Sequence, residues 1–511
     1  MILNLLNLLN LGLLTKTQYD TIYPTGSSPA ILYGLPKVHK KNTPLRPIMS
    51  STNTFNRKLS QFLIPLLLPL TSNRFTVKST FTFCTEINSY THPSPLIMAS
   101  LDIESLFTNV PLFETIEIVL ELLFQNTTHV NGFNRKQFKQ LLLLACTNNI
   151  FLFNGKLYLQ KEGVAMGGCL SPILANIFMC YHEEKWLTAC PDTFKPVLYR
   201  RYVDDTFLLF HHKIHIAQFK TYLNSKHPNI TFTSENEVEG CLPFIGVNVV
   251  HQDLRFKTFV YRKPTDTGLG MNFFSFVCSS YKVNSILTML HRCYSIVSNW
   301  TLFHDEVSYR HEYYINNNFP SSLFWGMVRK FTNRIMNPRI ITYNVPKDKQ
   351  YISLPFFGHP SYIVRNKLLS LFKIHFPQID IKIVLTNRRT IGSLFPVKER
   401  LAIPLCSNVI YQYKCGDCSS SYVGSTERAL HDRICEHKGV SFRTGIRLTS
   451  PSFSSIREHS VSCSHPIDTD LFRIIGRCSD HEDLRLLESV FIKHLKPDLN
   501  NTESAAPLYI L

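Results

Sequence analysis

A pair of acidic residues between two apolar runs constrains this chain more than any other feature. The run at 197–203 is followed by Asp204 and Asp205, and then by a second run at 206–210. Aromatic and β-branched runs on both sides of a two-residue polar break are typical of a β-hairpin. Asp-Asp is not a favoured turn pair, and two carboxylates about 4 Å apart repel by roughly 4 kcal/mol at an effective dielectric near 20. The sequence therefore predicts a hairpin tip that is either solvated or bound to a divalent cation.

Length and charge limit the class of protein. The 511 residues are enough for two or three domains, and the formal charge of +17 is spread along the chain. That charge indicates a polyanionic partner, either nucleic acid or an anionic membrane. Fourteen cysteines in so long a chain are too sparse for a disulfide scaffold and favour a reduced intracellular protein.

The apolar N-terminus at 1–14 is shorter than the roughly 20 residues that cross a bilayer. It also lacks the cationic start and the cleavage site of a signal peptide. We therefore expect either a packed helix there or the ragged start of an incomplete chain, with no membrane anchor and no readable targeting signal.

A basic segment at 31–52 is punctuated by Gly34 and three prolines. This composition predicts a loop or β-ribbon held in one shape and able to face phosphates, with a solvated basic loop as the alternative. Its cationic side chains are Lys37, His39, Lys40, Lys41 and Arg46.

Further candidate residues follow short apolar runs. Asp102 comes directly after the run at 96–101, so it lies at a strand end or caps a helix. Phe107 is close enough in the chain to pack beside whatever Asp102 binds. Gly167, within a Gly-Gly pair, lets the backbone approach a flat ligand closely, and the Ser-Pro pair at 171–172 is a good helix start.

The next part of the chain contains further strands and helices and no residue pattern that suggests chemistry. The segments 242–250 and 256–267 read as two more strands of the sheet that holds the acidic hairpin. Helical periods follow at 281–299 and 361–375. This region either grips a duplex or is plain scaffold.

Taken in order, these segments resemble the palm motifs of reverse transcriptases. The strings YGLPKVHK, PLRPIMSS, LDIESLFTNVP, VAMGGCLSPILANIFM, YRRYVDDTFLLF and VYRKPTDT together resemble the Penelope-like retroelement reverse transcriptases over roughly residues 30–500. One departure is Ile245-Gly246 after Leu-Pro-Phe, where that family usually has Leu-Asp.

The resemblance implies a two-metal nucleotidyl transfer. Asp102 and Asp204 would hold two Mg²⁺, and Asp205 would support them. In the same family-based interpretation Lys37 and Arg46 clamp the triphosphate. The remaining implied roles are selection of deoxynucleotides by Phe107 and contact with the template–base-pair surface by Gly167.

Cysteines become denser after residue 400, and a strand, a Cys-x-x-Cys turn, a second strand and a helix are expected over 408–440. This order resembles the GIY-YIG endonucleases, as does Glu488 on a later helix. Phosphodiester hydrolysis needs a general base, a cation near the phosphate and a metal ligand. The resemblance assigns the first role to Tyr411, Tyr422 or His437, the second to Arg433, and the third to Glu488 with one Mg²⁺.

Cys415 and Cys418 can offer two thiolates to Zn²⁺. His459 and His465 are the candidate completing ligands, with Cys463 as a substitute. The alternative is a pair of reduced cysteines at a turn with surface histidines.

The expected fold is an α+β right-hand polymerase followed by a small α/β GIY-YIG nuclease domain. Fingers and an antiparallel palm would occupy 1–268, a helical thumb and linker 269–400, and the nuclease with its zinc knuckle 401–511. The expected function is target-primed reverse transcription in the nucleus by a retrotransposon polymerase, with template RNA, target DNA and dNTPs as partners. Two alternatives are a decayed or domesticated nucleic-acid-binding protein and a repair nuclease with an inert palm.

Overall fold

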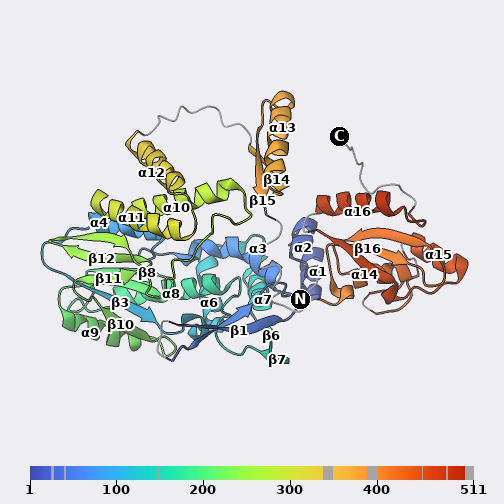
Figure 1. The fold of residues 1–511 in the computed structure, drawn as a ribbon. Helices are drawn as coiled ribbons and strands as arrows, with labels where there is room; N and C mark the ends of the chain where they lie inside the picture. The colour runs from blue at the N-terminus through green and yellow to red at the C-terminus, as the bar shows by residue number, and fades with distance from the viewer. Residues whose placement is uncertain are drawn as a thin grey trace.

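The computed structural model describes residues 1–24, 28–38, 42–147, 149–337, 349–387, 401–442, 444–449, 451, 453–478 and 481–500 (Figure 1). Helices and antiparallel sheets are mixed along the chain, which agrees with the predicted α+β class. The N-terminus forms the expected packed helix, α1 (Ile2–Asn10). None of the described helices is both long enough and apolar enough to cross a membrane.

The basic segment is a β-ribbon, as predicted. Strands β1 (Ala30–Pro36) and β2 (Leu45–Ser50) pair antiparallel, and the amide of Lys37 donates to the carbonyl of Pro44 at 2.9 Å. The ribbon belongs to an N-terminal sheet of order β2-β1-β6-β7 with β6 (Ile150–Phe153) and β7 (Lys156–Leu159). His39, Lys40 and Lys41 lie outside the described residues.

A central sheet of order β10-β3-β9-β8 holds the acidic hairpin. Its members are β3 (Ile97–Ile103), β8 (Leu198–Tyr202), β9 (Asp205–Phe210) and β10 (Phe232–Asn236). Along β9, Leu208 and Phe210 join one core cluster while Phe207 and Leu209 join another. Because both faces are covered, the strand is a continuous apolar run and not an alternating one.

Helices cover the two faces of the central sheet. The larger cluster includes residues of α6 (Leu112–Leu123), α8 (Ser171–Thr188) and α9 (Lys213–Asn224). Helix α8 begins at the predicted Ser-Pro pair. The opposite cluster includes α4 (Thr80–Ser89). The other elements of this region are α2 (Lys16–Ile22), α3 (Arg57–Leu67), α5 (Leu106–Asn109), α7 (Arg135–Cys146) and the short pair β4 (His129–Val130) and β5 (Phe133–Asn134).

The prediction that 242–250 and 256–267 extend the central sheet is wrong. They form a separate sheet of order β11-β12-β13, with β11 (Cys241–Phe244), β12 (Val247–Gln252) and β13 (Arg255–Val260). The first segment is itself a hairpin, because Ile245 and Gly246 have φ of 41° and 82° and turn the chain between Phe244 and Val247. The departure at Ile245-Gly246 thus places a glycine where the turn needs a positive φ.

The helical periods correspond to α10 (Ser279–Ile296) and α13 (His359–His375). Helix α10 packs with α11 (Trp300–Asn316) and α12 (Ser321–Met336) around a core of their own. Helix α13 connects two parallel strands that the sequence analysis did not predict, β14 (Lys349–Pro355) and β15 (Asp380–Thr386).

The C-terminal unit, defined here as residues 401–500, has the expected strand–turn–strand–helix order. It consists of a sheet of order β17-β16-β18, with α16 on one face and two shorter helices on the other. Figure 1 shows this unit beside α1 and α2. Its elements are β16 (Val409–Lys414), β17 (Ser421–Thr426), α14 (Leu430–Lys438), α15 (Ser455–Cys463), β18 (Phe472–Arg477) and α16 (His481–Leu495).

Candidate functional site

The acidic hairpin is present, and its tip is strained. Tyr202 pairs with Asp205, so Val203 and Asp204 form the two-residue turn between β8 and β9. Val203 has φ of 57°, a conformation that a β-branched side chain rarely adopts. Such a residue costs about 1–3 kcal/mol and persists only where its surroundings enforce it. The turn that carries Asp204 is therefore held in place by contacts elsewhere in the fold.

Asp102 lies in strand β3 directly opposite the hairpin. It is the register partner of Asp205, and the amide of Ile103 donates to the carbonyl of Asp204 at 3.2 Å. The alternative that Asp102 caps a helix is wrong, because Ser105 is the residue that precedes α5. Three carboxylates thus meet at one end of the central sheet.

A buried hydroxyl fixes the alignment of these strands, and the sequence analysis missed it. Thr206 is fully buried, and its Oγ1 accepts the amide of Leu101 at 2.8 Å and donates to the carbonyl of the same residue at 2.7 Å. This bridge lies next to the Asp102–Asp205 pair. A threonine at the start of an otherwise apolar strand was the available signal.

Burial and, after it, like charges raise the pKa of one of the three acids. Burial, together with the neighbouring carboxylates of Asp204 and Asp102, raises the pKa of Asp205 to about 6, and Lys263 opposes the shift. A divalent cation would relieve this repulsion. An all-carboxylate set of oxygen ligands also suits Mg²⁺. The residues therefore fit the predicted metal site.

Phe107 lies on α5, which starts four residues after Asp102. Its side chain is half-buried and packs partly against the main core. Its carbonyl accepts the amide of Val164 at 2.7 Å, which ties α5 to the loop that leads into α8. The structure thus joins the segment after Asp102 to the Gly-rich loop.

Gly167 allows its loop to approach strand β2 closely. Its φ is 110°, and a Cβ atom there would lie 2.6 Å from the carbonyl oxygen of Met49 on β2. Ser51 Oγ donates to the carbonyl of Gly167 at 2.8 Å, and the Met49 amide donates to the carbonyl of Met166 at 2.7 Å. The loop is therefore fastened to the basic ribbon.

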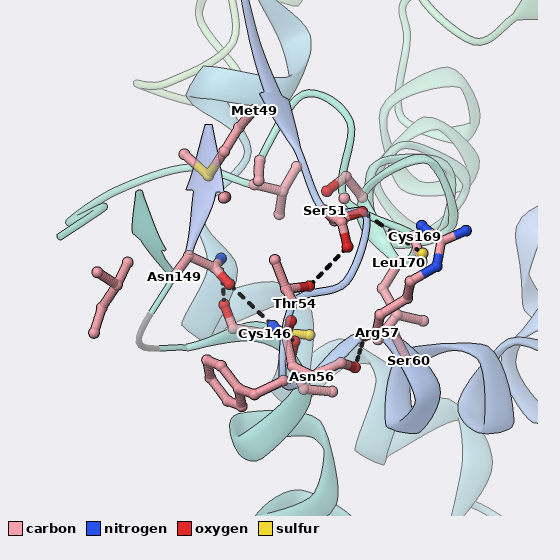
Figure 2. A pocket seen from close by; sticks show the side chains of 18 of the residues that line it. Met49, Ser51, Thr54, Asn56, Arg57, Ser60, Cys146, Asn149, Cys169 and Leu170 are labelled. Carbon is pink, nitrogen blue, oxygen red and sulfur yellow. Dashed lines mark hydrogen bonds between the residues drawn. The ribbon is translucent and has the colours of Figure 1, made fainter. Parts of the chain in front are cut away.

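A pocket of about 280 Å³ lies where the ribbon, α3, α7 and this loop meet (Figure 2). Figure 2 shows the hydrogen bonds that frame it, including one between the amide groups of Asn56 and Asn149 at 3.1 Å. Apolar side chains line most of the remainder, among them Met49, Leu170 and Leu174. The pocket marks the junction between the N-terminal sheet and the helices α3, α7 and α8.

Replacing Gly167 by alanine is expected to destabilise the fold by roughly 2–3 kcal/mol, because a strained φ is added to a clash with Met49. Gly155→Ala is the matched control, since Gly155 has φ of 73° but no atom within 4 Å of a new Cβ. Urea unfolding of both variants measures the difference. Equal losses of unfolding free energy in the two variants would mean that the contact with β2 does not contribute to stability.

The predicted phosphate-binding cations are on the ribbon. Arg46 pairs with Leu35 and is exposed, whereas Lys37 is half-buried beyond the end of β1. Both therefore lie on the N-terminal sheet, and the three acids lie on the central sheet. A substrate that touches both sets would bridge the two sheets.

In the C-terminal unit, four side chains form a hydrogen-bonded chain. Arg433 Nε donates to the hydroxyl of Tyr411 at 3.2 Å, and that hydroxyl contacts His437 Nε2 at 2.7 Å. His437 Nδ1 lies 2.5 Å from Ser454 Oγ. Because Arg433 can only donate, the Tyr411 proton points to His437, and Nδ1 carries the imidazole proton. Tyr411 and His437 are both fully buried.

The other predicted residues of this unit reach solvent. Tyr422 and Glu488 are half-buried, and Ser425 Oγ donates to a carboxylate oxygen of Glu488 at 2.7 Å. Burial raises the pKa of Glu488, while Ser425 and Arg433 oppose the shift. Burial also raises the pKa of Tyr422. Arg433, Tyr422 and Glu488 are thus the members of the predicted set that a substrate can touch.

His437 is expected to make the C-terminal unit sensitive to acid. Burial and the adjacent Arg433 lower its pKa to about 3, so the folded state resists a proton that the unfolded chain binds below pH 6.5. Stability is then complete above about pH 7 and falls as the pH drops through 6.5, by roughly 2 kcal/mol at pH 5.

Hydrogen exchange of the β16 amides between pH 5 and 8, corrected for the intrinsic exchange rate, measures this loss. His437→Gln is the control, because glutamine can replace both hydrogen bonds without titrating. If the wild type and the variant lose stability in parallel, His437 is not the cause.

Two cysteines and two histidines converge beside the β16–β17 turn. The ligand atoms of Cys415, Cys418, His459 and His465 all lie within 4.8 Å of one another. Sγ of Cys415 is 3.3 Å from His465 Nδ1, Sγ of Cys418 is 3.5 Å from His459 Nε2, and these two nitrogens are 3.4 Å apart. The edges of a tetrahedral zinc site are roughly 3.5 Å between S and N and roughly 3.3 Å between N and N.

The structure separates Cys463 from these four groups. Its Sγ lies 3.7 Å from His459 Nδ1, the ring nitrogen that faces away from Cys418. Cys463 is therefore placed to contact the ring of His459 from outside the four-residue group. His465 supplies the fourth candidate ligand atom of that group. The residues fit a Cys₂His₂ site.

A second group of Glu114, His182 and His227 also has ligand atoms within 4.8 Å. His227 Nδ1 accepts the amide of Asn229 at 3.1 Å, so in the neutral ring Nε2 carries the proton. That proton points to Glu114 at 3.2 Å, and His182 Nε2 contacts the other carboxylate oxygen at 3.0 Å. Hydrogen bonds account for this group without a metal.

Comparison with known proteins gives a family for part of the chain. Residues 38–230 match the family described as reverse transcriptase (RNA-dependent DNA polymerase). None of the curated proteins that were compared matches the chain. The matched residues contain the whole acidic site and the Gly-rich loop, and the match ends before the C-terminal unit.

Several solved structures are similar at low identity. They include apo telomerase from Candida tropicalis truncated from its C-terminal domain (18% identity, 45% of this chain, 55% of that chain, TM-score 0.33). Telomerase from Candida albicans in complex with a fragment of telomeric RNA is 14% identical (61% of this chain, 64% of that chain, TM-score 0.37). The Sicinivirus RNA-dependent RNA polymerase is 10% identical (62% of this chain, 71% of that chain, TM-score 0.38). The chain thus spans less than two thirds of these telomerase chains. Residues 38–230 are a reverse transcriptase domain, and Asp102, Asp204 and Asp205 lie within it.

Proposed function

We propose that the chain is an RNA-directed DNA polymerase of a Penelope-like retroelement, joined to a DNA-nicking endonuclease. The observation that carries the proposal is the meeting of Asp102, Asp204 and Asp205 at one end of the central sheet, inside the matched domain. In this proposal residues 1–268 are fingers and palm, and residues 269–400 are thumb and linker.

Asp102 and Asp204 would hold two Mg²⁺, and Asp205 would support them. Bound Mg²⁺ supplies activation of the primer 3′-hydroxyl and neutralisation of the leaving pyrophosphate. Lys37 and Arg46 bind the triphosphate through charge-assisted hydrogen bonds. The ring of Phe107 occupies the space of a ribose 2′-hydroxyl, which selects deoxynucleotides.

The basic ribbon is fastened to the loop at Gly167, and this contact supports a joint surface for nucleotide and template. The ribbon brings cations from the N-terminal sheet, and the loop leads into α8 beneath the acidic hairpin. A base pair held between them has its phosphates toward Lys37 and Arg46.

The C-terminal unit is proposed to be a GIY-YIG nuclease with a zinc knuckle. Arg433 binds the scissile phosphate, Tyr422 is the general base that takes a proton from the attacking water, and Glu488 would hold one Mg²⁺. Tyr411 and His437 are buried, so they position Arg433 and do not touch the substrate. Cys415, Cys418, His459 and His465 would hold Zn²⁺, which supplies a structural cross-link.

Together the two activities would carry out target-primed reverse transcription in the nucleus. The nuclease nicks chromosomal DNA, and the polymerase extends the exposed 3′ end on template RNA. The net charge of +17 supports binding of both nucleic acids.

Primer extension by the purified chain on poly-rA/oligo-dT with Mg²⁺ and dTTP tests the polymerase. Extension by the wild type and none by Asp102→Asn is the expected result. A folded wild type that binds the duplex but never extends the primer would overturn the assignment and favour a binding-only protein.

Nicking of supercoiled plasmid tests the nuclease separately. The wild type is expected to produce open circles, and Glu488→Gln is expected to remove nicking while leaving primer extension intact. Plasmid that stays supercoiled with the zinc-loaded, folded wild type would contradict the nuclease assignment alone.

A further inference from the structure

A fully buried arginine lies two residues before the strained turn. Arg201 on β8 is 0% exposed, and its Nη1 donates to the carbonyl of Val203 at 2.9 Å. The same nitrogen donates to Asn176 Oδ1 on α8 at 3.0 Å, and Nη2 contacts Cys180 Sγ at 3.4 Å. The side chain therefore joins the acidic hairpin to the helix beneath it.

The charge of Arg201 is matched by an equally buried acid. Its Nε donates to Glu183 Oε1 on α8 at 2.5 Å, and the Glu183 side chain is 2% exposed. Tyr199 donates to the same oxygen at 2.7 Å, and Asn73 donates to the other at 3.3 Å. Every polar atom of this pair thus has a partner, which a buried ion pair requires.

The contact with Val203 distinguishes this pair from an ordinary core ion pair. A valine in the left-handed region needs an external constraint, and the Val203 carbonyl is held by Arg201. Asp204 follows directly, and Asp205 begins the next strand. The orientation of the hairpin tip therefore depends on a guanidinium that reaches no solvent.

We propose that Arg201, fixed by Glu183 and Asn176, is a positioning residue that holds the Val203–Asp204 turn so that the three carboxylates face one metal-binding point. This inference rests on the proposed polymerase function and adds to it a residue that touches neither metal nor substrate. Without the guanidinium, the turn relaxes toward a conformation that valine prefers, and Asp204 leaves the position opposite Asp102.

The test removes the Arg201 guanidinium that holds the turn, without leaving the Glu183 charge buried and unpaired. Arg201→Met combined with Glu183→Leu replaces the pair by apolar side chains, a change that cores often tolerate. Binding of Mn²⁺ alone, measured by electron paramagnetic resonance, is expected to weaken about ten-fold, and kcat for primer extension is expected to fall at least as much. The KM for dTTP is expected to stay the same.

Val203→Gly is the decisive variant in this test, because glycine adopts a positive φ without a hydrogen bond to Arg201 to hold it there. Added to the double variant, it is expected to restore most of the Mn²⁺ affinity and of kcat. A purely structural ion pair would show no such rescue. Arg200→Met with Glu86→Leu is the matched control, since this neighbouring ion pair does not touch the turn, and wild-type Mn²⁺ affinity is expected.

Several outcomes overturn the proposal. Unchanged Mn²⁺ affinity in the folded double variant does so, and so does an impaired double variant that Val203→Gly fails to rescue. If the double variant does not fold, Arg201→Lys keeps the buried charge but offers fewer donors, and it must weaken Mn²⁺ binding and be rescued by Val203→Gly. A wild type that binds Mn²⁺ but never extends a primer contradicts the polymerase function and leaves this test intact.

Discussion

Replacing Asp204 by asparagine is expected to lower kcat for primer extension by about 10³-fold or more. The substitution keeps the shape of the side chain but removes the charge that would hold a cation, and metal-based charge stabilisation contributes several kcal/mol at about 1.4 kcal/mol per factor of ten. Single-turnover extension on poly-rA/oligo-dT measures the loss. Duplex binding is expected to be unchanged.

The same substitution is expected to raise the melting temperature. Burial is the largest cause of the raised pKa of Asp205, and the charges of Asp204, Asp102 and Glu235 add to it. Loss of the negative charge at Asp204 therefore relieves repulsion in the folded state. Lower activity with higher stability is the signature of a site built from like charges. A merely disruptive mutation would lower both.

Glu104→Gln is the matched control for this experiment. Glu104 is an exposed acid two residues after Asp102, and its described contacts are made by its backbone. Wild-type extension is expected from this variant. If Asp204→Asn extends primers at the wild-type rate, the hairpin is not the polymerase site, whatever the stability change.

Sequence reasoning succeeded where the signal is local. The hairpin at Asp204-Asp205 and the ribbon at 31–52 are present, because strand runs and turn residues act over a few positions. The Cys415 and Cys418 turn, with two later histidines, also converges as expected. The two histidines could be predicted because zinc binds few types of side chain, so few downstream residues were candidates.

It failed where pairing between distant segments decides the structure. Strands β11 to β13 form their own sheet, and β14 pairs with β15 across the whole of α13. No local sequence pattern predicts which sheet a hairpin joins. Arg201 was not singled out because nothing in the local sequence distinguishes it from Arg200, and only the packing against α8 shows that Arg201 is buried.

Removal of zinc is expected to unfold the C-terminal unit while the polymerase keeps working. The four candidate ligands tie the β16–β17 turn to α15 and to the segment after it, and zinc binding in small domains contributes apparent energies of about 10–16 kcal/mol. Cys415→Ser is therefore expected to abolish plasmid nicking and to expose 401–500 to protease. Primer extension by the same preparation is expected to persist, because the acidic site lies in a separate sheet with its own core.

Cys463→Ser supplies the matched control, since its sulfur lies 3.7 Å from the outward-facing nitrogen of His459 and outside the four ligands. One zinc per chain by mass spectrometry is expected for the wild type and for Cys463→Ser, and none for Cys415→Ser. Equal zinc content in the two variants would exclude the Cys₂His₂ assignment. A wild type that nicks DNA without zinc would show that the hydrophobic core around Tyr411 and Tyr413 alone stabilises the unit.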